Sequence, residues 1–182
     1  MLHLHPCSKR DIAELVHWFP DRQAALEWGG ASLTWPLQKK ALHRLIRAHK
    51  GREPTIEVWS AFDGTDLVGH GQLRYAAHLD SATLGRVAIC PNRRGEGLGT
   101  QLMAALLAKA FSRAALHRVD LMVYTHNTPA LALYNRLGFT LEGTRRETTP
   151  FEDKRWSTHM MSRLRSEYLQ SNRLFDKRTE GE

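Results

Sequence analysis

A glycine-rich loop directly before a helix constrains this chain more than any other feature. Residues 91–102 read PNRRGEGLGTQL, with two arginines followed by three glycines at alternate positions. Apolar residues then recur at helical spacing from Leu98 to Ala110, which predicts a helix of about four turns. The start of a helix leaves N–H groups unpaired and attracts anions, and glycines let a phosphate approach the backbone. The stretch therefore predicts an anion cradle, with a ligand-free basic turn as the alternative.

The spacing of the glycines excludes the two best-known phosphate loops. A P-loop follows the pattern GxxxxGK[ST], and no lysine follows these glycines. A dinucleotide-binding loop follows the pattern GxGxxG, and its third glycine is absent here. If the loop binds a phosphate group, the loop is therefore neither a P-loop nor a dinucleotide-binding loop but another kind of pyrophosphate site.

The order of the predicted elements indicates one α/β domain. The predicted strands span residues 2–5, 55–62, 67–75, 82–89, 118–124, 139–143 and 154–164, and the predicted helices span residues 8–19, 37–49, 98–110 and 128–138. Ser8 is a plausible cap for the first helix, and Gly51 closes the second. Residues 27–36, EWGGASLTWP, carry no clear pattern. We expect a domain over residues 1–165, followed by a charged helix or disordered tail over 166–182.

Composition and charge narrow the class of protein. The chain has 182 residues and a formal net charge of +7, which favours acidic partners such as nucleotide phosphates, nucleic acid or an anionic protein surface. No apolar stretch approaches the roughly 18 residues of a membrane helix, and no signal peptide is evident, so we expect a soluble cytoplasmic protein without membrane contact. Cys7 and Cys90 lie in no metal-ligand pattern, so we expect no metal.

A second motif follows the loop at a fixed distance. Residues 127–139 read NTPALALYNRLGF, and residues 94–99 have the pattern R-x-x-G-x-G. In this order and spacing, the two motifs resemble the GNAT superfamily of acetyl-coenzyme A dependent N-acetyltransferases. The segments EGTRRE and DKRWSTHMMSRL are similar to the branch that includes the ribosomal-protein N-terminal acetyltransferases. The resemblance is strong over residues 54–164. It implies the GNAT fold, a mixed and mostly antiparallel central sheet of about seven strands flanked by helices.

The resemblance also implies which residues bind acetyl-coenzyme A (acetyl-CoA). Family members wrap its pyrophosphate with the loop backbone and hold its pantetheine arm along the preceding strand and the asparagine of the second motif. The residues that match these positions are Val87, Ala88, Ile89, Arg93, Arg94, Gly95, Gly97, Leu98, Gly99, Thr100, Asn127, Ala130 and Tyr134. The alternative for Asn127 is a role in starting the helix, although Thr128 before Pro129 already suits the cap position.

Tyr134 matches the family tyrosine that protonates the departing thiolate. A phenol of pKa about 10 is a competent donor to a thiolate of pKa about 8.5 in an aligned, dry site. Tyr134 also shares a helical face with Ala130, Leu133 and Leu137, so the alternative is a core aromatic residue.

The general base is less evident. Some family members carry a glutamate on the strand before the asparagine, where this chain has Met122 or Val123. The candidates here are Glu57, His70, His78 and His126, and we take Glu57 and His126 as the catalytic candidates beside Tyr134. A water-relayed proton transfer without a single base is equally compatible.

The acceptor amine enters family members opposite the coenzyme, between the early helices and the last two strands. Those regions contain Trp28, Trp35, Glu147, Glu152 and Asp153, which suit a cationic amine unless they only pack or face solvent. His70 completes the predicted substrate residues, which are Trp28, Trp35, His70 and Glu147. Glu14 and Glu27 are expected to be helix-surface charges.

The predicted function is transfer of an acetyl group from acetyl-CoA to a primary amine, with a protein N-terminus as one acceptor. The alternatives are a small-molecule amine acetyltransferase and, from another class, a non-catalytic acyl-CoA-binding or nucleic-acid-binding module. No helix-turn-helix or aromatic-basic RNA motif is evident, so nucleic acid is not the expected partner. The expected assembly is a monomer or a homodimer.

Overall fold

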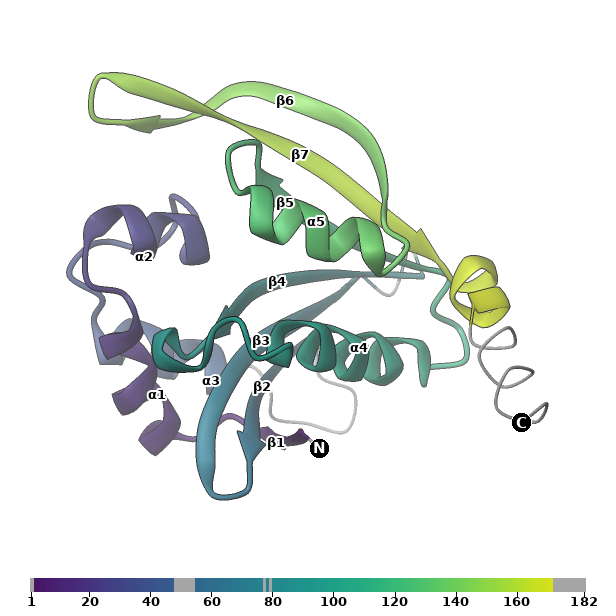
Figure 1. Ribbon diagram of the computed structural model, residues 1–182, viewed down its shortest axis with the longest axis horizontal. Helices are drawn as coiled ribbons and strands as arrows, with labels where there is room; N and C mark the ends of the chain where they lie inside the picture. Colours follow the sequence, from purple (N-terminus) through teal and green to yellow (C-terminus); the bar gives the residue numbers. More distant parts are fainter. Residues whose placement is uncertain (1, 48–54, 77, 79, 172–182) are drawn as a thin grey trace.

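A computed structural model describes residues 2–47, 55–76, 78 and 80–171, and it contains one seven-stranded sheet of order β1-β2-β3-β4-β5-β7-β6. The strands are β1 His3–Pro6, β2 Ile56–Asp63, β3 Asp66–Ala76, β4 Ser81–Ile89, β5 Arg118–Tyr124, β6 Thr140–Phe151 and β7 Lys154–Leu164. The α-helices are α1 Lys9–Leu15, α2 Arg22–Gly29, α3 Lys39–Arg47, α4 Leu98–Phe111 and α5 Thr128–Arg136. Helices lie on both sides of the sheet, which confirms the predicted fold class (Figure 1).

The sheet opens between its two parallel strands. All neighbouring strands are antiparallel except β4 and β5, which pair only from Ser81–Leu84 to Arg118–Leu121. Beyond Leu84 the two strands diverge, so the upper layer of β5, β6, β7 and α5 separates from the lower layer of β2, β3 and β4 (Figure 1). The divergence leaves the last part of β4 without a strand on its β5 side.

A β-bulge in β4 marks the point of divergence. His70 of β3 pairs with Ala88, and Gln72 pairs with Gly85, so one residue of β3 faces two of β4. Arg86, in the bulge, has a φ of 50°, in the left-handed region. Because an extra residue reverses the alternation of side chains, Leu84 and Ala88 lie in the cores on opposite faces of the sheet.

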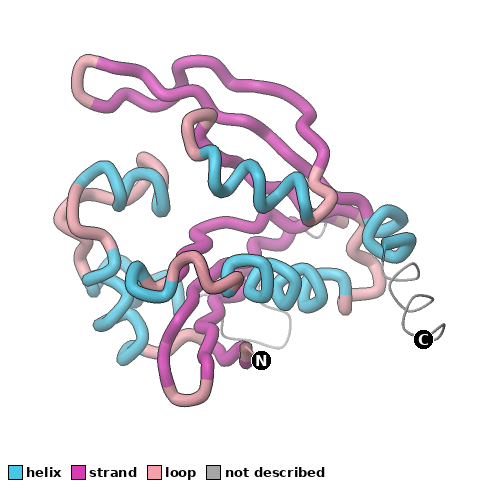
Figure 2. Tube along the Cα trace, in the orientation of Figure 1, coloured by secondary structure: helices cyan, strands magenta, loops and turns pink. Residues whose placement is uncertain are grey.

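Two apolar cores cover the two faces of the sheet. Helix α4 packs on one face, where Leu102 and Leu106 are fully buried. Helices α1, α2 and α3 pack on the other face around Ile12, Leu15 and Val58, and Figure 2 shows the helices on either side of the strands. The close approach of α4 needs a residue without a side chain on β3, because a Cβ atom at Gly71 would lie 2.5 Å from Leu106 Cδ1.

The N-terminal region differs in part from its predicted elements. Ser8 caps α1 as predicted, in a capping box with Asp11, but α1 ends at Leu15 and continues as a 3-10 turn. Helix α2 was not predicted, because its pattern is short and ends in two consecutive glycines. The predicted end of α3 at Gly51 lies outside the described residues.

The last two strands form a longer hairpin than predicted. Strand β6 continues from Thr140 to Phe151, and only a turn at residues 152–153 joins it to β7. A register shift lies between Arg145 and Thr149 of β6, and Glu147 within it has a φ of 52°. The extension of β6 beyond residue 143 was not predicted because its side chains are mostly polar and exposed, without the apolar alternation that indicates a strand.

The chain after β7 is helical where it is described. Residues 165–171 form a helix whose Tyr168 stacks on Phe111 at 4.7 Å between ring centroids. Arg165 donates hydrogen bonds to the carbonyl oxygens of Phe111 and Leu116. These contacts attach the start of the predicted 166–182 segment to the domain, and residues 172–182 lie outside the described part of the chain.

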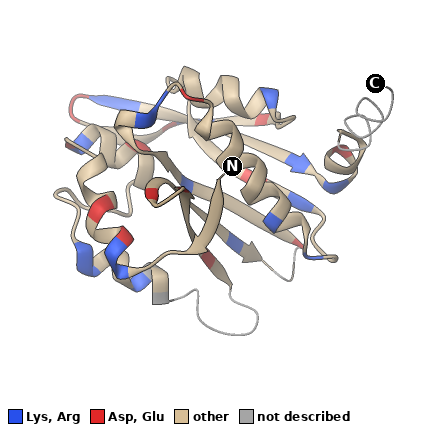
Figure 3. Ribbon diagram, turned by 60° about the horizontal axis from the view of Figure 1, so that its bottom comes forward, with Lys and Arg blue, Asp and Glu red and all other residues tan. Residues whose placement is uncertain are grey.

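None of the described helices is long and apolar enough to cross a bilayer. Within the same residues, no group of three or more histidine, cysteine, aspartate or glutamate side chains is arranged to hold a metal ion. Lys and Arg are interspersed with Asp and Glu over helices and strands in the view of Figure 3, so this view shows no single basic stripe.

His70 is a fully buried histidine at the centre of β3. Gln72 accepts a hydrogen bond from Arg86 through Oε1, so its Nε2 faces His70 Nε2 at 3.3 Å and donates to it. The ring of Trp28 lies at 5.6 Å, edge-on. Burial, and then the charge of Arg86, lowers the pKa of His70 to about 3, so the imidazole stays neutral in the folded protein.

The free energy of unfolding is therefore expected to decrease as the pH is lowered, because of His70. In the unfolded chain its imidazole takes up a proton below about pH 6.5, whereas in the folded protein it does so only near pH 3. Its contribution is complete above pH 6.5 and decreases on acidification, by about 2 kcal/mol at pH 5. Urea unfolding of wild type and of His70→Gln at pH 7 and pH 5 measures this difference. The exposed His17→Gln is the control, and an equal pH dependence in all three proteins would contradict the assignment.

Candidate active site

Two cavities lie where β4 and β5 diverge. The first, which we call the loop-side cavity, has a volume of about 570 Å³ and extends from Ile89 and Gly99 to Pro129. The second, the hairpin-side cavity, has a volume of about 590 Å³ and extends from Thr83 and Arg86 to Thr158. Both are lined by the same six residues, Glu27, Trp28, Val87, Asn127, Ala130 and Tyr134. The two cavities therefore meet, and a molecule in one would contact a molecule in the other at these six residues.

The glycine loop carries free backbone N–H groups, and its Arg94 and Gly99 line the loop-side cavity. Gly95 and Gly97 have φ angles of 86° and 77°, which other residues rarely adopt, and Gly97 begins α4 without a side-chain cap. Thr100 N–H donates to Gly97 O at 3.1 Å, but within the described part of the chain the N–H groups of residues 95–99 have no acceptor. Unpaired N–H groups at a helix start form an anion site.

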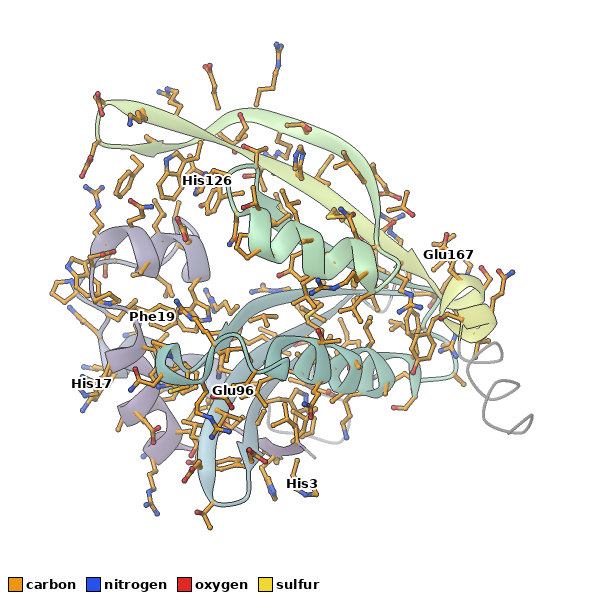
Figure 4. The ribbon with its side chains drawn as sticks, viewed as in Figure 1. His3, His17, Phe19, Glu96, His126 and Glu167 are labelled. Atoms are coloured by element: carbon orange, nitrogen blue, oxygen red, sulfur yellow. The ribbon has the colours of Figure 1, made fainter. Side chains whose placement is uncertain are left out.

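The two arginines of the loop have different surroundings. Arg94 lines the loop-side cavity, where its charge adds to that of the helix start. Arg93 faces away and pairs with Asp63 at 3.0 Å and Glu96 at 2.8 Å. Since these carboxylates occupy its guanidinium, Arg93 joins the loop to the β2–β3 turn in place of its predicted role in coenzyme binding. Figure 4 shows Glu96 in the loop before α4.

The end of β4 lies along the loop-side cavity. Val87, Ala88 and Ile89 all line it, and β4 has no strand on its β5 side beyond Leu84. On the other side Ala88 and Ile89 pair with His70 and Gly69 of β3, so the strand is held in place from one edge only. A strand with one free edge can hydrogen-bond an extended molecule as a further strand would.

Asn127 starts α5 and lines both cavities. Its Oδ1 accepts a hydrogen bond from Ala130 N–H at 3.2 Å, so Asn127 and not Thr128 is the helix cap. The expectation that Thr128 fills this position is wrong because α5 begins at Thr128 itself, with Pro129 in its first turn. The cap uses only the oxygen of the amide, and the Nδ2 group of Asn127 has no acceptor within the described residues.

Tyr134 lies at the junction of the two cavities. It projects from α5 and contacts the core next to Phe139, at 5.9 Å between ring centroids. Burial raises the pKa of its phenol to about 12, so the hydroxyl keeps its proton over the whole physiological range. Tyr134 is therefore compatible with both interpretations of its helical spacing, as a core aromatic residue and as a site residue. It packs against the core and also lines both cavities.

Glu27 and His126 form a pair across the opening. Glu27 lies on α2 and lines both cavities, and its Oε1 is 3.1 Å from His126 Nε2. The imidazole stacks on Tyr124 and contacts Trp156 edge-on, which fixes its orientation. Figure 4 shows His126 between α2 and the β6–β7 hairpin. The sequence placed Glu27 on a helix surface, and only the packing of α2 against β4 brings it to the site.

Several other predicted site residues lie elsewhere. Glu57 accepts hydrogen bonds from Trp59 and Tyr75 and pairs with Arg113 at 2.8 Å, and it lines neither cavity. The structure thus gives Glu57 a structural role in place of the predicted catalytic one. His78 is exposed outside both cavities.

Of the predicted acceptor residues, Trp28 alone lines the cavities. It stacks on Phe19 at 4.4 Å and donates a hydrogen bond from Nε1 to Arg86 O at 2.7 Å. Trp35 and Glu147 are exposed and line neither cavity, and His70 lies behind Trp28 in the core. These three predictions differ from the structure because sequence position alone does not show which side chains of the loop after α2, of β3 and of β6 face the opening.

Apart from the six residues shared with the other cavity, the hairpin-side cavity is lined mostly by residues that the sequence did not single out. They are mostly basic and hydroxyl-bearing, and they include Arg74, Arg86, Arg145, Thr83, Thr148, Thr149 and Thr158. Each comes from a different strand position and no local motif joins them. Only the pairing of β3 with β4 and of β6 with β7 gathers them on one side of the opening.

Comparisons with known proteins agree with this geometry. Residues 20–139 match the model of the acetyltransferase (GNAT) family. A mycothiol acetyltransferase of Corynebacterium glutamicum is 30% identical over 135 residues, which is 73% of this chain and 43% of that protein. The chain therefore spans less than half the length of this curated relative.

Solved structures share the fold at lower identity. A spermidine N-acetyltransferase from Vibrio cholerae, in complex with CoA and spermine, has a TM-score of 0.80 at 23% identity, over 92% of this chain and 98% of that one. The ribosomal-protein-S18-alanine N-acetyltransferase from Escherichia coli has a TM-score of 0.68 at 21% identity, over 90% and 94%. With the family model matching about two thirds of the residues, the resemblance that the two motifs indicated is confirmed, and this chain belongs to the acetyltransferase (GNAT) family.

Proposed function

We propose that this chain is an N-acetyltransferase that transfers the acetyl group of acetyl-CoA directly to a primary amine. The observation that carries the proposal is the meeting of two cavities at Tyr134, where β4 and β5 diverge. One cavity has an anion site at its end and the other opens toward the β6–β7 hairpin. Two substrates held in this way would meet with their reacting atoms side by side, which supplies much of the rate enhancement.

The residues of the loop-side cavity suit acetyl-CoA. The free N–H groups of residues 95–99 and the charge of Arg94 would hold the pyrophosphate. The free edge of β4 from Val87 to Ile89 would hydrogen-bond the pantetheine arm, with Asn127 Nδ2 on the opposite wall. This arrangement would direct the thioester carbonyl toward the junction, where a backbone N–H could stabilise its developing negative charge.

Tyr134 is the donor to the leaving sulfur in this proposal. The amine nitrogen forms a bond to the carbonyl carbon, the carbon–sulfur bond breaks, and the sulfur leaves with the electron pair as a thiolate. Tyr134 carries its proton throughout, because burial raises the pKa of the phenol to about 12. A dry site also raises the pKa of the thiol, so the hydrogen bond from Tyr134 to sulfur strengthens as the thiolate forms.

Glu27 and His126 would accept the proton that the amine loses. Glu27 reaches both cavities, and its 3.1 Å contact with His126 leads from the junction to a half-exposed imidazole. The proton can pass along this pair to solvent, either directly or through a water molecule. This assignment keeps His126 among the catalytic residues and replaces Glu57 with Glu27.

The acceptor proposed from the sequence is a protein N-terminus, with a small-molecule amine as the alternative. Family members of the same fold act on both kinds of acceptor, since a spermidine and a ribosomal-protein acetyltransferase share it. A non-catalytic acyl-CoA-binding module would use the loop-side cavity alone. Turnover, not coenzyme binding, therefore distinguishes the enzyme from that module.

Acetyl-CoA is expected to stabilise the protein through the glycine loop. At a concentration of 100 times its Kd, a ligand adds about 2.7 kcal/mol, which for a domain of this size raises the Tm by about 5–10 °C. Gly99→Asp is expected to weaken binding at least 10-fold, because its carboxylate would repel the phosphates while remaining favourable for the helix start. Calorimetric titration measures the Kd. Ala104→Asp, on the exposed side of α4, is the control, and unchanged binding by Gly99→Asp would exclude the loop as the phosphate site.

Replacement of Tyr134 by phenylalanine is expected to lower kcat by about 100-fold or more, since only the hydrogen bond to the leaving sulfur is lost. The Kd for acetyl-CoA should change less than about 3-fold, because the aromatic ring and its packing remain. Thiol release from acetyl-CoA with a saturating amine gives kcat. The matched control is Tyr168→Phe, whose ring stacks on Phe111 away from both cavities. A kcat equal to that of wild type would limit Tyr134 to packing.

Glu27 and His126 are expected to act as one unit. Glu27→Gln and His126→Gln should each lower kcat by about 10- to 100-fold, and the double variant should be no slower than the slower single variant. Steady-state assays of the four proteins complete this cycle. Losses that multiply in the double variant would show two independent roles, and no loss in either single variant would leave proton transfer to water alone.

A further inference from the structure

The hairpin-side cavity carries an unbalanced positive charge. Arg74, Arg86 and Arg145 line it, and Glu27 is the single carboxylate among its lining residues. Glu27 already contacts His126 and accepts a hydrogen bond from Gln23. Within residues 2–47, 55–76 and 80–171, none of the three arginines has a carboxylate at ion-pair distance. The acceptor side of the proposed reaction thus has cationic groups that no carboxylate of the described residues neutralises.

Arg86 is the most constrained of these arginines. Its guanidinium donates hydrogen bonds to Gln72 Oε1 and to Ser32 Oγ, both at 3.2 Å. Both acceptors are neutral, so they orient the cation without neutralising it. Burial, and then the charge of Arg74, lowers the pKa of Arg86 from its usual value. Two neighbouring cations in a partly buried site are unfavourable alone and favourable once an anion lies between them.

Three arginines outside this cavity are paired with carboxylates. Arg93 contacts Asp63 and Glu96, Arg113 contacts Glu57, and Arg118 contacts Asp120 and Glu142. The three arginines that line the hairpin-side cavity have no such partner among the described residues. A charge arrangement of this kind is typical of a binding site, where the ligand supplies the missing charge.

The phosphates of the coenzyme do not account for these cations. The glycine loop and Arg94 belong to the loop-side cavity and do not line the other one. Arg74, Arg86 and Arg145 line only the hairpin-side cavity. An anion bound by them would therefore belong to the second substrate.

The same cavity carries neutral hydrogen-bond donors beside the cations. Four threonines line it, and the Thr148 and Thr158 hydroxyls lie 3.5 Å apart across β6 and β7. Hydroxyl groups and guanidinium groups together match the several oxygen atoms of a carboxylate or a phosphate. A polyamine, which carries only positive charges, would be repelled by this lining.

We propose that the acceptor is a small amine that also carries an anionic group, a carboxylate or a phosphate, which Arg86 and Arg74 bind while the amine faces Tyr134. This inference rests on the proposed N-acetyltransferase function. Arg86 directly precedes Val87, which lines both cavities, so the anion site and the junction share one stretch of β4. An α-amino acid and an aminoalkyl phosphate are simple amines of this class.

Matched pairs of acceptors test the inference. L-Alanine is compared with L-alaninamide, and O-phosphoethanolamine with ethanolamine, by thiol release from acetyl-CoA. We expect kcat/KM to be at least about 10-fold higher for one or both anionic members of the pairs, because a charge-assisted hydrogen bond contributes at least that factor to binding. The difference should appear as a lower KM. The pair that responds distinguishes a carboxylate from a phosphate. Spermidine and a peptide with neutral residues at its N-terminus complete the panel, and a higher kcat/KM for either of them, or for the neutral members, would overturn the inference.

Charge changes at Arg74 locate the anion site. Arg74→Gln should raise KM for the anionic acceptor about 10-fold and leave the neutral member of the pair unchanged. Arg74→Glu should reverse the preference within the pair, because a carboxylate then faces the acceptor. Arg86→Gln is a second variant with the same expectation, accepted only where its circular dichroism matches wild type. Lys109→Gln removes one positive charge as the matched control. Lys109 lies on α4 over the ring of Trp59 and lines neither cavity.

A failure of the inference differs from a failure of the proposed function. If neutral amines are acetylated better than anionic ones, the enzyme function stands and the inference is wrong. If no amine is acetylated, the proposed function is wrong, and the cavity is tested without turnover. Inorganic phosphate, added to protein saturated with CoA, should then raise the Tm of wild type more than that of Arg74→Glu, and equal shifts would exclude an anion site.

Discussion

The interruption of hydrogen bonding between β4 and β5 is the constraint on which the site depends. Strand pairing ends at Leu84 and Leu121, and the bulge at Arg86 turns the rest of β4 away. An unpaired strand edge inside a protein is costly unless something else satisfies its backbone. Here the edge faces two cavities, so a substrate can take the place of the missing strand. The two halves of the sheet stay joined because one core contains residues of both, with Leu73 and Leu84 on one side of the opening and Leu121 and Met161 on the other.

Electrostatics divides the opening into two sites of different kinds. At the loop-side cavity, backbone N–H groups and one arginine form the positive site, and the second loop arginine is neutralised by Asp63 and Glu96. At the hairpin-side cavity, side-chain guanidinium groups carry the charge. Backbone N–H groups can bind a phosphate whatever the neighbouring side chains are. A site made of side chains can change its ligand specificity through single substitutions. This difference suits a fixed coenzyme on one side and a family-specific acceptor on the other.

Much of the fold followed from local patterns in the sequence. The seven strands, the cap at Ser8 and the helix after the glycine loop depend on periodicity and on backbone chemistry within a few residues. Helix α2 and the extension of β6 did not follow, because their stability comes from packing and from strand pairing with β7. The candidate site divides in the same way. Its loop and Tyr134 lie in contiguous motifs, whereas Glu27 and Arg86 become neighbours of the site only through contacts far apart in the sequence.

The sequence by itself determined most of the elements, the family and the position of the glycine loop before α4. These properties depend on residues close together in the chain, where backbone geometry and helix ends act directly. Only the tertiary structure decided which charges face the opening. In the structure Glu57 is buried beside Arg113, and Arg93 pairs with Asp63 away from the cavities. Glu27 lies at the junction, and Arg74 and Arg86 line the hairpin-side cavity. The physical reason is that strand register and the bulge in β4 determine the direction of each side chain, and both arise from pairing between distant segments.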